Sequence, residues 1–492
     1  MDQSQIDLLR VRQIAPQSHF IDGRWQAPRE VLEVTSPIDG KSLTTIGRAD
    51  HDEVDQAVAA ARKSFDDGRW SRMPPAARKK IMHRIADLIE AHALELAVLG
   101  VRDNGTEIGM AIKAEPGSAA GTFRFYAEAI DKVYGEVAPT ADNVLGLIQK
   151  EPIGVVGAII PWNFPLMIGA WKLAPAIAAG NSIVLKPAEV ASLSWLRLTE
   201  LCAEAGLPDG VLNVVTGKGT VAGEAMGLHK DIDVLVFTGS GFVGRKLLEY
   251  SARSNLKRVY LELGGKSPNV IFDDAKDIEA AAIGSVNGIF RNSGQVCVAG
   301  SRILVQRSIK DQFLEAFVRH AEALNVGDPL NLTNDVGAVT SSTQLAQNLG
   351  HVDKAKNEGA TLLTGGDQIN QASGGNYMAP TVFSDVSSTM SLAQEEVFGP
   401  VAAVMDFEDE AQAVAIANDS DYGLAAGVWT ADLSRAHRMV RSIRSGVVHV
   451  NCYGGPDVTV PLTGFKQSGN GSDKSMYALD KYTDLKTAWI QL

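Results

Sequence analysis

Four short apolar runs, separated by helical segments, do most to restrict what this chain can fold into. The run at 153–160 is continuously apolar, as expected of a strand buried on both faces, and similar runs lie at 181–186, 212–216 and 233–238. A helical segment between the second and third runs ends at Gly206. This alternation predicts an α/β fold with a parallel sheet that is covered by helices on both sides. Ligands of such sheets bind beyond the carboxyl ends of the strands.

The rest of the chain divides into regions of different character. Near the N-terminus, short alternating runs such as 18–25 predict a small hairpin. Apolar residues recur at helical spacing from 54 to 136, which predicts a set of helices. A second α/β region is expected from 265 to 470. The alternating, apolar stretch 484–492 predicts an edge strand that pairs across a subunit interface.

Composition limits the class of protein. A chain of 492 residues exceeds what one hydrophobic core usually supports, so two or three domains are expected. A net charge of -12 argues against a nucleic-acid surface or an anionic membrane as partner. Three cysteines offer no disulfide framework and fit a reducing compartment. The sequence shows neither a signal peptide nor an apolar run of the roughly 20 residues that span a bilayer, so we expect a cytoplasmic protein.

Cys297 stands beside a Gly-Gln turn at the end of the stretch 290–297. A cysteine becomes a nucleophile where backbone N–H groups or positive charge favour its thiolate. The alternative, that Cys297 is a buried small apolar residue, is the commoner state of a lone cysteine. Other segments of the chain supply the groups that a catalytic cysteine needs, and they favour the nucleophile.

Two polar residues that follow predicted strands are candidates for such groups. Asn163 lies in a loop between Pro161 and Pro165, and its amide can donate to a developing oxyanion, although a turn asparagine can also satisfy its own backbone. Glu262 lies between two leucines, so we expect it to be desolvated, with a raised pKa that suits a general base. The alternative for Glu262 is a salt bridge to Lys266.

A glycine-rich turn at 237–244 follows a strand, opens a helix and matches the pattern G-x-G-x-x-G. This context fits a helix N-terminus that faces a phosphate, although glycines at such turns are also common for packing reasons. The acid expected about 20 residues further on, which binds a ribose, is Glu262 by spacing. Lys186 and Glu189 lie at the end of an earlier strand. They are either alternative ligands of the ribose, in place of Glu262, or the solvated start of a helix. Glu396 is a further ribose candidate or a simple loop acid.

Taken in order, these segments resemble the NAD(P)-dependent aldehyde dehydrogenase superfamily, and the resemblance covers nearly the whole chain. The stretch 451–490 is most similar to the branch of γ-glutamyl-γ-aminobutyraldehyde and related aminoaldehyde dehydrogenases. The resemblance implies a Rossmann-like parallel-sheet cofactor domain, a second α/β catalytic domain and a small β oligomerisation flap. The implied boundaries are 1–130 with 153–264 for the cofactor domain, 265–470 for the catalytic domain, and 131–152 with 471–492 for the flap.

The resemblance also implies a role for each catalytic group. Cys297 would be the nucleophile, Glu262 the general base, and Asn163 the oxyanion donor together with the backbone N–H of Cys297. Glu189 then holds the adenosine ribose in place of Glu262, and its carboxylate would repel a 2′-phosphate, which makes NAD the expected cofactor over NADP. No metal is expected. The implied cofactor-binding residues are Ile159, Pro161, Trp162, Lys186, Glu189, Gly219, Phe237, Gly239, Ser240, Gly244, Leu263, Glu396 and Phe398.

The implied substrate is an aldehyde, and two charged residues bear on its class. Arg291 occupies a position that is usually aromatic in the family, and it either binds a substrate carboxylate or turns toward a neighbouring acid. Asp457 either pairs with Arg291 or attracts a cationic substrate. An aminoaldehyde is the first choice, and carboxylate-bearing, aromatic or aliphatic aldehydes are alternatives. The residues expected to line the tunnel are Phe164, Met167, Trp171, Arg291, Val296, Asp457 and Leu462.

Two other classes of protein share this fold. A CoA-acylating relative generally lacks the base, so Glu262 argues against it. A non-catalytic dinucleotide-binding relative is expected to lack Cys297, Glu262 or Asn163, and all three are present. We expect the protein to form a homo-oligomer, either a dimer or a homotetramer.

Overall fold

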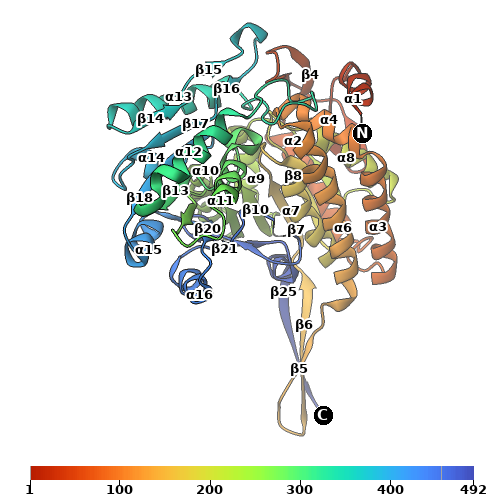
Figure 1. Ribbon diagram of the computed structural model, residues 1–492. Helices are drawn as coiled ribbons and strands as arrows, with labels where there is room; N and C mark the ends of the chain where they lie inside the picture. The colour runs from red at the N-terminus through yellow and green to blue at the C-terminus, as the bar shows by residue number, and fades with distance from the viewer. Residues whose placement is uncertain (1, 456) are drawn as a thin grey trace.

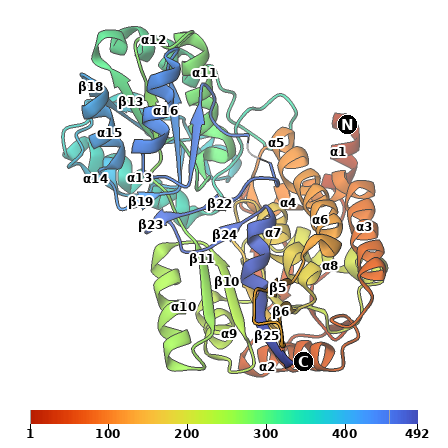
Figure 2. The same cartoon turned by 90° about the horizontal axis from the view of Figure 1, so that it is seen from below.

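Two seven-stranded sheets, each covered by helices, form the body of the molecule (Figures 1 and 2). The computed structural model describes residues 2–455 and 457–492. No helix in this described part is long and apolar enough to cross a membrane. The strands of the first sheet, in spatial order, are β11 (Arg258–Glu262), β10 (Val234–Thr238), β7 (Val155–Ile159), β8 (Ser182–Lys186), β9 (Leu212–Val214), β1 (His19–Ile21) and β2 (Arg24–Gln26).

The first sheet confirms the parallel α/β fold that the apolar runs predict. Strands β7 to β11 pair in parallel, and their side chains are almost entirely buried, because helices cover both faces. One face packs on α2 (His51–Asp66), α9 (Glu224–Leu228) and α10 (Gly241–Arg253). The other face packs on α3 (Pro75–Ala91), α6 (Ser118–Ala129), α7 (Pro165–Ala179) and α8 (Leu193–Glu204), and α4 (Ala93–Asn104) and α5 (Ile108–Ile112) flank these helices.

The second sheet is also mainly parallel. Its strands, in spatial order, are β14 (Thr361–Thr364), β17 (Thr381–Ser384), β18 (Val401–Phe407), β13 (Arg302–Gln306), β12 (Pro268–Ile271), β20 (Ala425–Trp429) and β21 (Val447–Val450). Helices α11 (Ile278–Phe290) and α12 (Lys310–Glu322) pack on one face. Helices α13 (Ser342–Asn357), α14 (Ser391–Gln394), α15 (Glu410–Asn418) and α16 (Leu433–Ser442) pack on the other.

A third, three-stranded sheet projects from the body and carries the C-terminus (Figure 1). It consists of β5 (Glu136–Ala138), β6 (Val144–Pro152) and β25 (Thr483–Gln491). The expected C-terminal strand is therefore present, and it pairs along its whole length with β6 of its own chain. Because β25 is the outer strand, its other edge remains available, and Leu485 and Trp489 are exposed on it. Pairing across a subunit interface stays a prediction.

The N-terminal region holds more structure than the sequence patterns predicted. The predicted hairpin is confirmed as β1 and β2, which turn at Asp22 and Gly23 with positive φ. It also extends the first sheet through a pair between Phe20 and Val214, which the local pattern did not indicate. The predicted helices between 54 and 136 are α2 to α6. The unpredicted elements are α1 (Gln3–Arg10) and the hairpin of β3 (Val31–Thr35) and β4 (Ser42–Gly47).

Three small ladders complete the chain. They pair β15 (Gln368–Ile369) with β16 (Tyr377–Met378), β19 (Tyr422–Gly423) with β23 (Phe465–Lys466), and β22 (Leu462–Thr463) with β24 (Ser472–Asp473). Glu262, at the end of β11, forms an isolated bridge with Gly469. This bridge ties the first sheet to the segment that follows the second sheet.

Candidate active site

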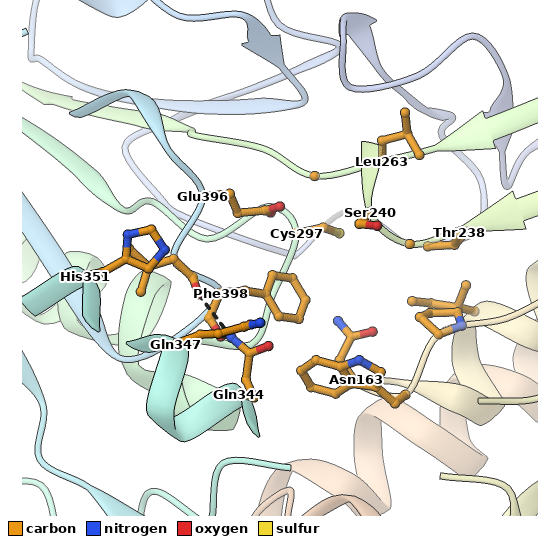
Figure 3. Close-up of a pocket in the computed structure, with 16 residues that line it drawn as sticks. Asn163, Thr238, Ser240, Leu263, Cys297, Gln344, Gln347, His351, Glu396 and Phe398 are labelled. Atoms are coloured by element: carbon orange, nitrogen blue, oxygen red, sulfur yellow. Dashed lines mark hydrogen bonds between the residues drawn. The ribbon is translucent and has the colours of Figure 1, made fainter. Parts of the chain in front are cut away.

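A cavity of about 260 Å³ lies where the ends of strands from the first sheet meet loops that lead into the second sheet (Figure 3). Two of the three predicted catalytic residues, Asn163 and Cys297, line it. The third, Glu262, is the last residue of β11 and directly precedes Leu263, which lines the cavity. Its lining residues are Pro161, Trp162, Asn163, Ile168, Thr238, Gly239, Ser240, Leu263, Gly264, Cys297, Gln344, Gln347, His351, Glu396, Val397 and Phe398.

Asn163 reaches the cavity from the loop after β7. Its side chain is buried, and Nδ2 donates to the carbonyl of Gln295 at 2.9 Å, two residues before Cys297. The amide nitrogen carries two hydrogens, so one bond fixes the orientation and the second hydrogen remains for another acceptor. The structure therefore places a positioned donor beside the cysteine loop.

The loop that carries Cys297 leaves α11 through a left-handed turn. Asn292 and Ser293 have φ of 50° and 52°, values that cost free energy in residues other than glycine. Gly294 also has positive φ, and a Cβ there would lie 2.1 Å from the carbonyl oxygen of Gly399. The turn therefore fits against the loop before β18 only with glycine at this position.

The environment of Cys297 differs from the thiolate-stabilising site that the sequence suggested. Burial raises the pKa of its thiol to about 12, and the nearby charges of Glu396 and Glu262 act in the same direction. Backbone N–H groups lower the pKa by less than burial raises it. The resting residue is a thiol, and its proton must leave before the sulfur acts as a nucleophile. The other two cysteines lie elsewhere, with Cys202 in the core and Cys452 exposed.

Glu262 is a desolvated carboxyl, as the flanking leucines predicted. It is buried, and neither carboxylate oxygen has a hydrogen-bond partner among the residues that the structure describes. Burial raises its pKa well above the ordinary range, the charge of Asp473 raises it further, and the charges of Lys481 and Lys172 oppose this shift. In the described part of the chain Lys266 makes no ion pair with Glu262. The structure therefore does not show the salt bridge that was the alternative for Glu262.

The glycine-rich turn and Glu396 form the other end of the cavity. Ser240 caps α10, and its hydroxyl accepts from the backbone N–H of Val243. Gly239 lines the cavity, and a Cβ at this position would lie 2.4 Å from the ring of Phe237. Glu396 accepts from the backbone N–H of Gly265 at 2.9 Å, and a Cβ on Gly264 would lie 1.9 Å from its carboxylate.

Lys186 and Glu189 lie outside this cavity. Lys186 is buried at the end of β8, and its Nζ lies 3.5 Å from the carboxylate of Glu189. Glu189 lines a neighbouring cavity of about 500 Å³ together with Lys218, and Gly219 follows that lysine directly. The predicted cofactor residues that line a cavity are therefore divided between two cavities.

Of the other predicted cofactor residues, four line the first cavity, namely Pro161, Trp162, Leu263 and Phe398. Trp162 and Phe398 form an edge-to-face pair with ring centroids 5.2 Å apart. Gly244 lies against Leu263, where a Cβ would come within 3.0 Å of the leucine side chain. Ile159, at the end of β7, belongs to the buried core beneath the turn.

The predicted substrate residues lie around Asn163 and the cysteine loop without lining the cavity itself. Phe164 is buried as the residue before α7, while Met167 and Trp171 are half-buried on that helix. Lys474 Nζ lies 5.5 Å from the centre of the Trp171 ring. Val296 packs against the core beside α11, and Leu462 begins β22.

Arg291 and Asp457 are both exposed. Arg291 Nε donates to the side chain of Asn287 at 3.2 Å, and Asp457 accepts from the backbone N–H of Thr459. No ion pair joins Arg291 to Asp457 in residues 2–455 and 457–492. Among the described residues Arg291 makes no ion pair with any acid, so the structure does not show the alternative in which it pairs with a neighbouring acid.

Sequence reasoning missed one wall of the cavity. Gln344, Gln347 and His351 project from one face of α13, on the side facing Cys297 and Glu396 (Figure 3). Their spacing of three and four residues along a helix that begins after the cap Ser341 was the available signal. It was weak, because polar residues at that spacing usually mark a solvated helix face. Ile168, Thr238, Gly264 and Val397 were also missed as lining residues.

Known proteins are similar to this chain in sequence and in fold. The model of the aldehyde dehydrogenase family matches residues 25–488. The NADP/NAD-dependent aldehyde dehydrogenase PuuC of Escherichia coli (strain K12) is 48% identical over 475 residues, which are 96% of this chain and 95% of PuuC. The γ-glutamyl-γ-aminobutyraldehyde dehydrogenase of Burkholderia cenocepacia J2315 is 45% identical, with a TM-score of 0.98 over 100% of both chains. The P. syringae AldA indole-3-acetaldehyde dehydrogenase, solved with NAD+ and IAA, has the same TM-score and coverage at 46% identity.

Proposed function

The chain belongs to the aldehyde dehydrogenase family, an oxidoreductase family that converts aldehydes to carboxylic acids, and from this premise we propose how its own residues carry out the reaction. The observation that carries the proposal is the meeting of Cys297 and Asn163 at one cavity, with Glu262 behind its wall. We further propose NAD as the cofactor, an aminoaldehyde as the substrate, and the roles given below for each residue.

The two cavities fit a dinucleotide. The backbone turn at Gly239 and Ser240 leads into a helix of 13 residues, whose N-terminus favours a phosphate. Glu189 would accept hydrogen bonds from one ribose and Glu396 from the other, and a carboxylate disfavours the 2′-phosphate of NADP. PuuC is NADP/NAD-dependent, and three of the structural relatives hold NAD+, which supports NAD as the cofactor.

The proposed reaction uses Cys297 and Asn163, which line the cavity, and Glu262, which lies behind its wall. The thiol of Cys297 gives its proton to solvent water, and the thiolate that results attacks the aldehyde carbon and gives a tetrahedral thiohemiacetal anion. The free hydrogen on Nδ2 of Asn163 and the backbone N–H of Cys297 stabilise the oxyanion. NAD, when bound, supplies the hydride acceptor. The Cys297 thioester that remains is hydrolysed by a water that Glu262 deprotonates, since a carboxyl with a raised pKa is a stronger base when it ionises.

The proposed substrate class is supported by the names of relatives and by two residues of this chain. An aminoaldehyde or γ-glutamylaminobutyraldehyde is supported by the names of two relatives of this chain. One is the γ-glutamyl-γ-aminobutyraldehyde dehydrogenase of Burkholderia cenocepacia J2315, and the other is the aminoacetaldehyde dehydrogenase of Pseudomonas aeruginosa, which is 43% identical over 96% of each chain. The exposed carboxylate of Asp457 suits a cationic chain. The second candidate is an aromatic aldehyde, which the half-buried Trp171 and the indole-3-acetaldehyde relative favour.

We also propose the domain roles implied by the topology. Residues 1–130 and 153–264 form the cofactor domain, 265–470 the catalytic domain, and 131–152 with 471–492 the oligomerisation flap. The exposed Leu485 and Trp489 on the outer strand of the projecting sheet support a homodimer or homotetramer assembled through this flap. Free thiols on all three cysteines support a reducing, cytoplasmic location.

A panel of aldehydes tests the substrate proposal. NADH formation by the purified protein is measured with neutral aliphatic, aromatic, ω-amino, γ-glutamylamino and ω-carboxy aldehydes of matched length. The proposal expects the highest kcat/KM for the amino and γ-glutamylamino compounds, unchanged in Arg291→Ala and lowered in Asp457→Asn. A preference for ω-carboxy aldehydes that Arg291→Ala abolishes would replace it. Acceleration by free CoA would assign the acyl-transfer class instead.

A further inference from the structure

The strained turn before Cys297 is held by a carboxylate that the reaction scheme does not use. Glu107 comes from the turn between α4 and α5, 185 residues earlier in the chain than Asn292. It is buried, and both carboxylate oxygens accept from the backbone N–H of Asn292, at 3.1 and 3.2 Å. Asn292 is the first of the two left-handed residues, so this bond is made at the point where the loop departs from helical geometry.

Other bonds connect the same turn to the catalytic groups. Thr106 donates its hydroxyl hydrogen to Oδ1 of Asn292 at 2.8 Å. Nδ2 of Asn292 then donates to the carbonyls of Asn163 and Gln295, at 3.2 and 3.3 Å. The carbonyl of Gln295 is also the acceptor that orients Nδ2 of Asn163. The turn is therefore one hydrogen bond from the oxyanion donor and five residues from the nucleophile.

We propose that Glu107 is a positioning residue of this enzyme, which fixes the Cys297 loop and the Asn163 amide together by holding the backbone of Asn292 in its left-handed conformation. The proposal rests on the role of Cys297 given above. A residue that lies in a left-handed conformation at a free-energy cost persists only where its surroundings over-determine it. The two oxygens of Glu107 and the hydroxyl of Thr106 are the surroundings that do so for Asn292.

The charge of Glu107 makes this arrangement dependent on pH. Burial raises the pKa of its carboxyl to about 7, the backbone N–H groups of Glu107 and Asn292 and the charge of Arg291 oppose the rise, and Asp335 adds to it. When the carboxyl is protonated, one oxygen carries a hydrogen and accepts less well from Asn292. Cys297 should therefore be held best above about pH 7.

The test uses full-length Glu107→Gln, which keeps one carbonyl acceptor and the side-chain size. The matched control is Asp103→Asn on the neighbouring helix, because Asp103 is also a fully buried carboxyl with a pKa raised to about 8 that accepts a backbone N–H, from Leu193 at 2.9 Å, without contacting the cysteine loop. The readouts are the rate of the first NADH burst and the rate at which iodoacetamide alkylates Cys297, each from pH 6 to 9, with peptide mapping to exclude Cys452. Thermal unfolding and KM for NAD are measured alongside.

The expected result is a burst and an alkylation rate in Glu107→Gln that are lower by about tenfold or more at pH 8, since a small misplacement of a reacting group costs up to about 10²-fold. The variant should also lack the wild-type inflection near pH 7 in alkylation, while its KM for NAD stays within about twofold. Asp103→Asn should lose thermal stability and keep both rates and the inflection.

Wild-type burst and alkylation profiles in a folded Glu107→Gln would overturn the proposal. If that variant does not fold, Thr106→Val tests the same turn, because it removes the hydrogen bond from the Thr106 hydroxyl to Oδ1 of Asn292. Burst and alkylation rates equal to those of the wild type would again overturn the proposal. Cys297→Ser separates this failure from failure of the proposed function. Activity in Cys297→Ser would remove the nucleophile assignment itself, whereas an inactive Cys297→Ser beside a wild-type Glu107→Gln would remove only the role of Glu107.

Discussion

The two large sheets have similar architecture but face the cavity with opposite ends. The first sheet presents the carboxyl ends of its strands, since Asn163 follows β7, Gly239 follows β10, and Glu262 ends β11. The second sheet presents segments that precede its strands. Cys297 lies five residues before β13, and Glu396 lies five residues before β18. The site is formed where the carboxyl edge of one sheet meets the amino edge of the other.

The two edges contribute different parts of the proposed chemistry. Strand ends on a parallel sheet provide rigid positions for an extended ligand, which suits the cofactor and the base. The segments that precede the second sheet are loops, and Cys297 depends on a strained turn to hold it. Under the proposed roles, the first sheet orients the cofactor and the base, and the second sheet supplies the reacting sulfur on a loop that has to be held in place.

The largest effect is expected at the amino edge. Cys297→Ala should lower kcat by about 10⁴-fold or more, because no other group can form the thioester. NAD binding, followed by protein fluorescence quenching, should persist. Measurable turnover with a normal burst would show that the second sheet does not supply the nucleophile.

Asn163→Ala, at the carboxyl edge, is expected to lower kcat by about 10²–10³-fold, as loss of one oxyanion donor commonly does. The dissociation constant of NAD should change little, because the cofactor residues stay in place. Near-normal turnover in a stopped-flow assay would contradict the proposed role of the first sheet in oxyanion stabilisation.

Glu262→Gln should separate the two half-reactions. The acylation burst of NADH persists, while the following steady state is slower by about 10²-fold, because the amide cannot deprotonate water. A trace without a burst would instead place Glu262 in the first half-reaction. Lys266→Met is a control on the same loop, since no described bond or ion pair joins Lys266 to Glu262.

The pH dependence of hydrolysis also tests the role of Glu262 as the general base. A general base works in its ionised form, and burial raises the pKa of Glu262 well above its ordinary range. The hydrolysis rate should therefore fall as the pH drops through this raised pKa, at higher pH than for an exposed glutamate. Glu262→Gln should be slow and nearly independent of pH over the same range. A wild-type profile that is flat down to the ordinary carboxyl range would contradict this.

The smallest effect is expected at Gly264, where the segment after β11 lies against the side chain of Glu396. In Gly264→Ala the new Cβ would lie 1.9 Å from the carboxylate of Glu396, so that side chain has to move. We expect KM for NAD to rise by about threefold to tenfold, the range in which one lost hydrogen bond falls, with kcat and thermal stability changing less. An unchanged KM would show that Glu396 does not contact the cofactor.

The comparison also explains what the sequence could predict. The rule that ligands bind at carboxyl ends of parallel strands applies to each strand separately, so Asn163, Glu189 and Glu262 were identifiable from local patterns. Cys297 and Glu396 precede their strands, so this rule does not apply to them. Cys297 was proposed as a nucleophile from its turn and the other segments, Glu396 remained a ribose candidate or a loop acid, and the resemblance to a family then chose between the alternatives. Glu107 was not identifiable, because its partner Asn292 is 185 residues away in the sequence.

Burial set a further limit on the prediction. Flanking leucines correctly indicated a desolvated Glu262. For Cys297 a stabilised thiolate was favoured over the buried alternative, whereas in the structure burial raises the pKa of its thiol to about 12. Desolvation of Cys297 comes from packing between segments far apart in the chain, including Gly265, whose added Cβ would lie 2.5 Å from the Cys297 carbonyl oxygen. Such contacts follow from the assembled fold and not from local sequence.

Trapping the acyl-enzyme tests most directly whether one edge supplies the nucleophile and the other the base. Glu262→Gln is mixed with NAD and an aldehyde substrate, quenched in acid after the burst, and examined by intact mass and peptide mapping. The account predicts close to one acyl group per chain on the peptide that contains Cys297, and little in the wild type. An acyl group on Cys202 or Cys452, or no adduct beside a full burst, would contradict it.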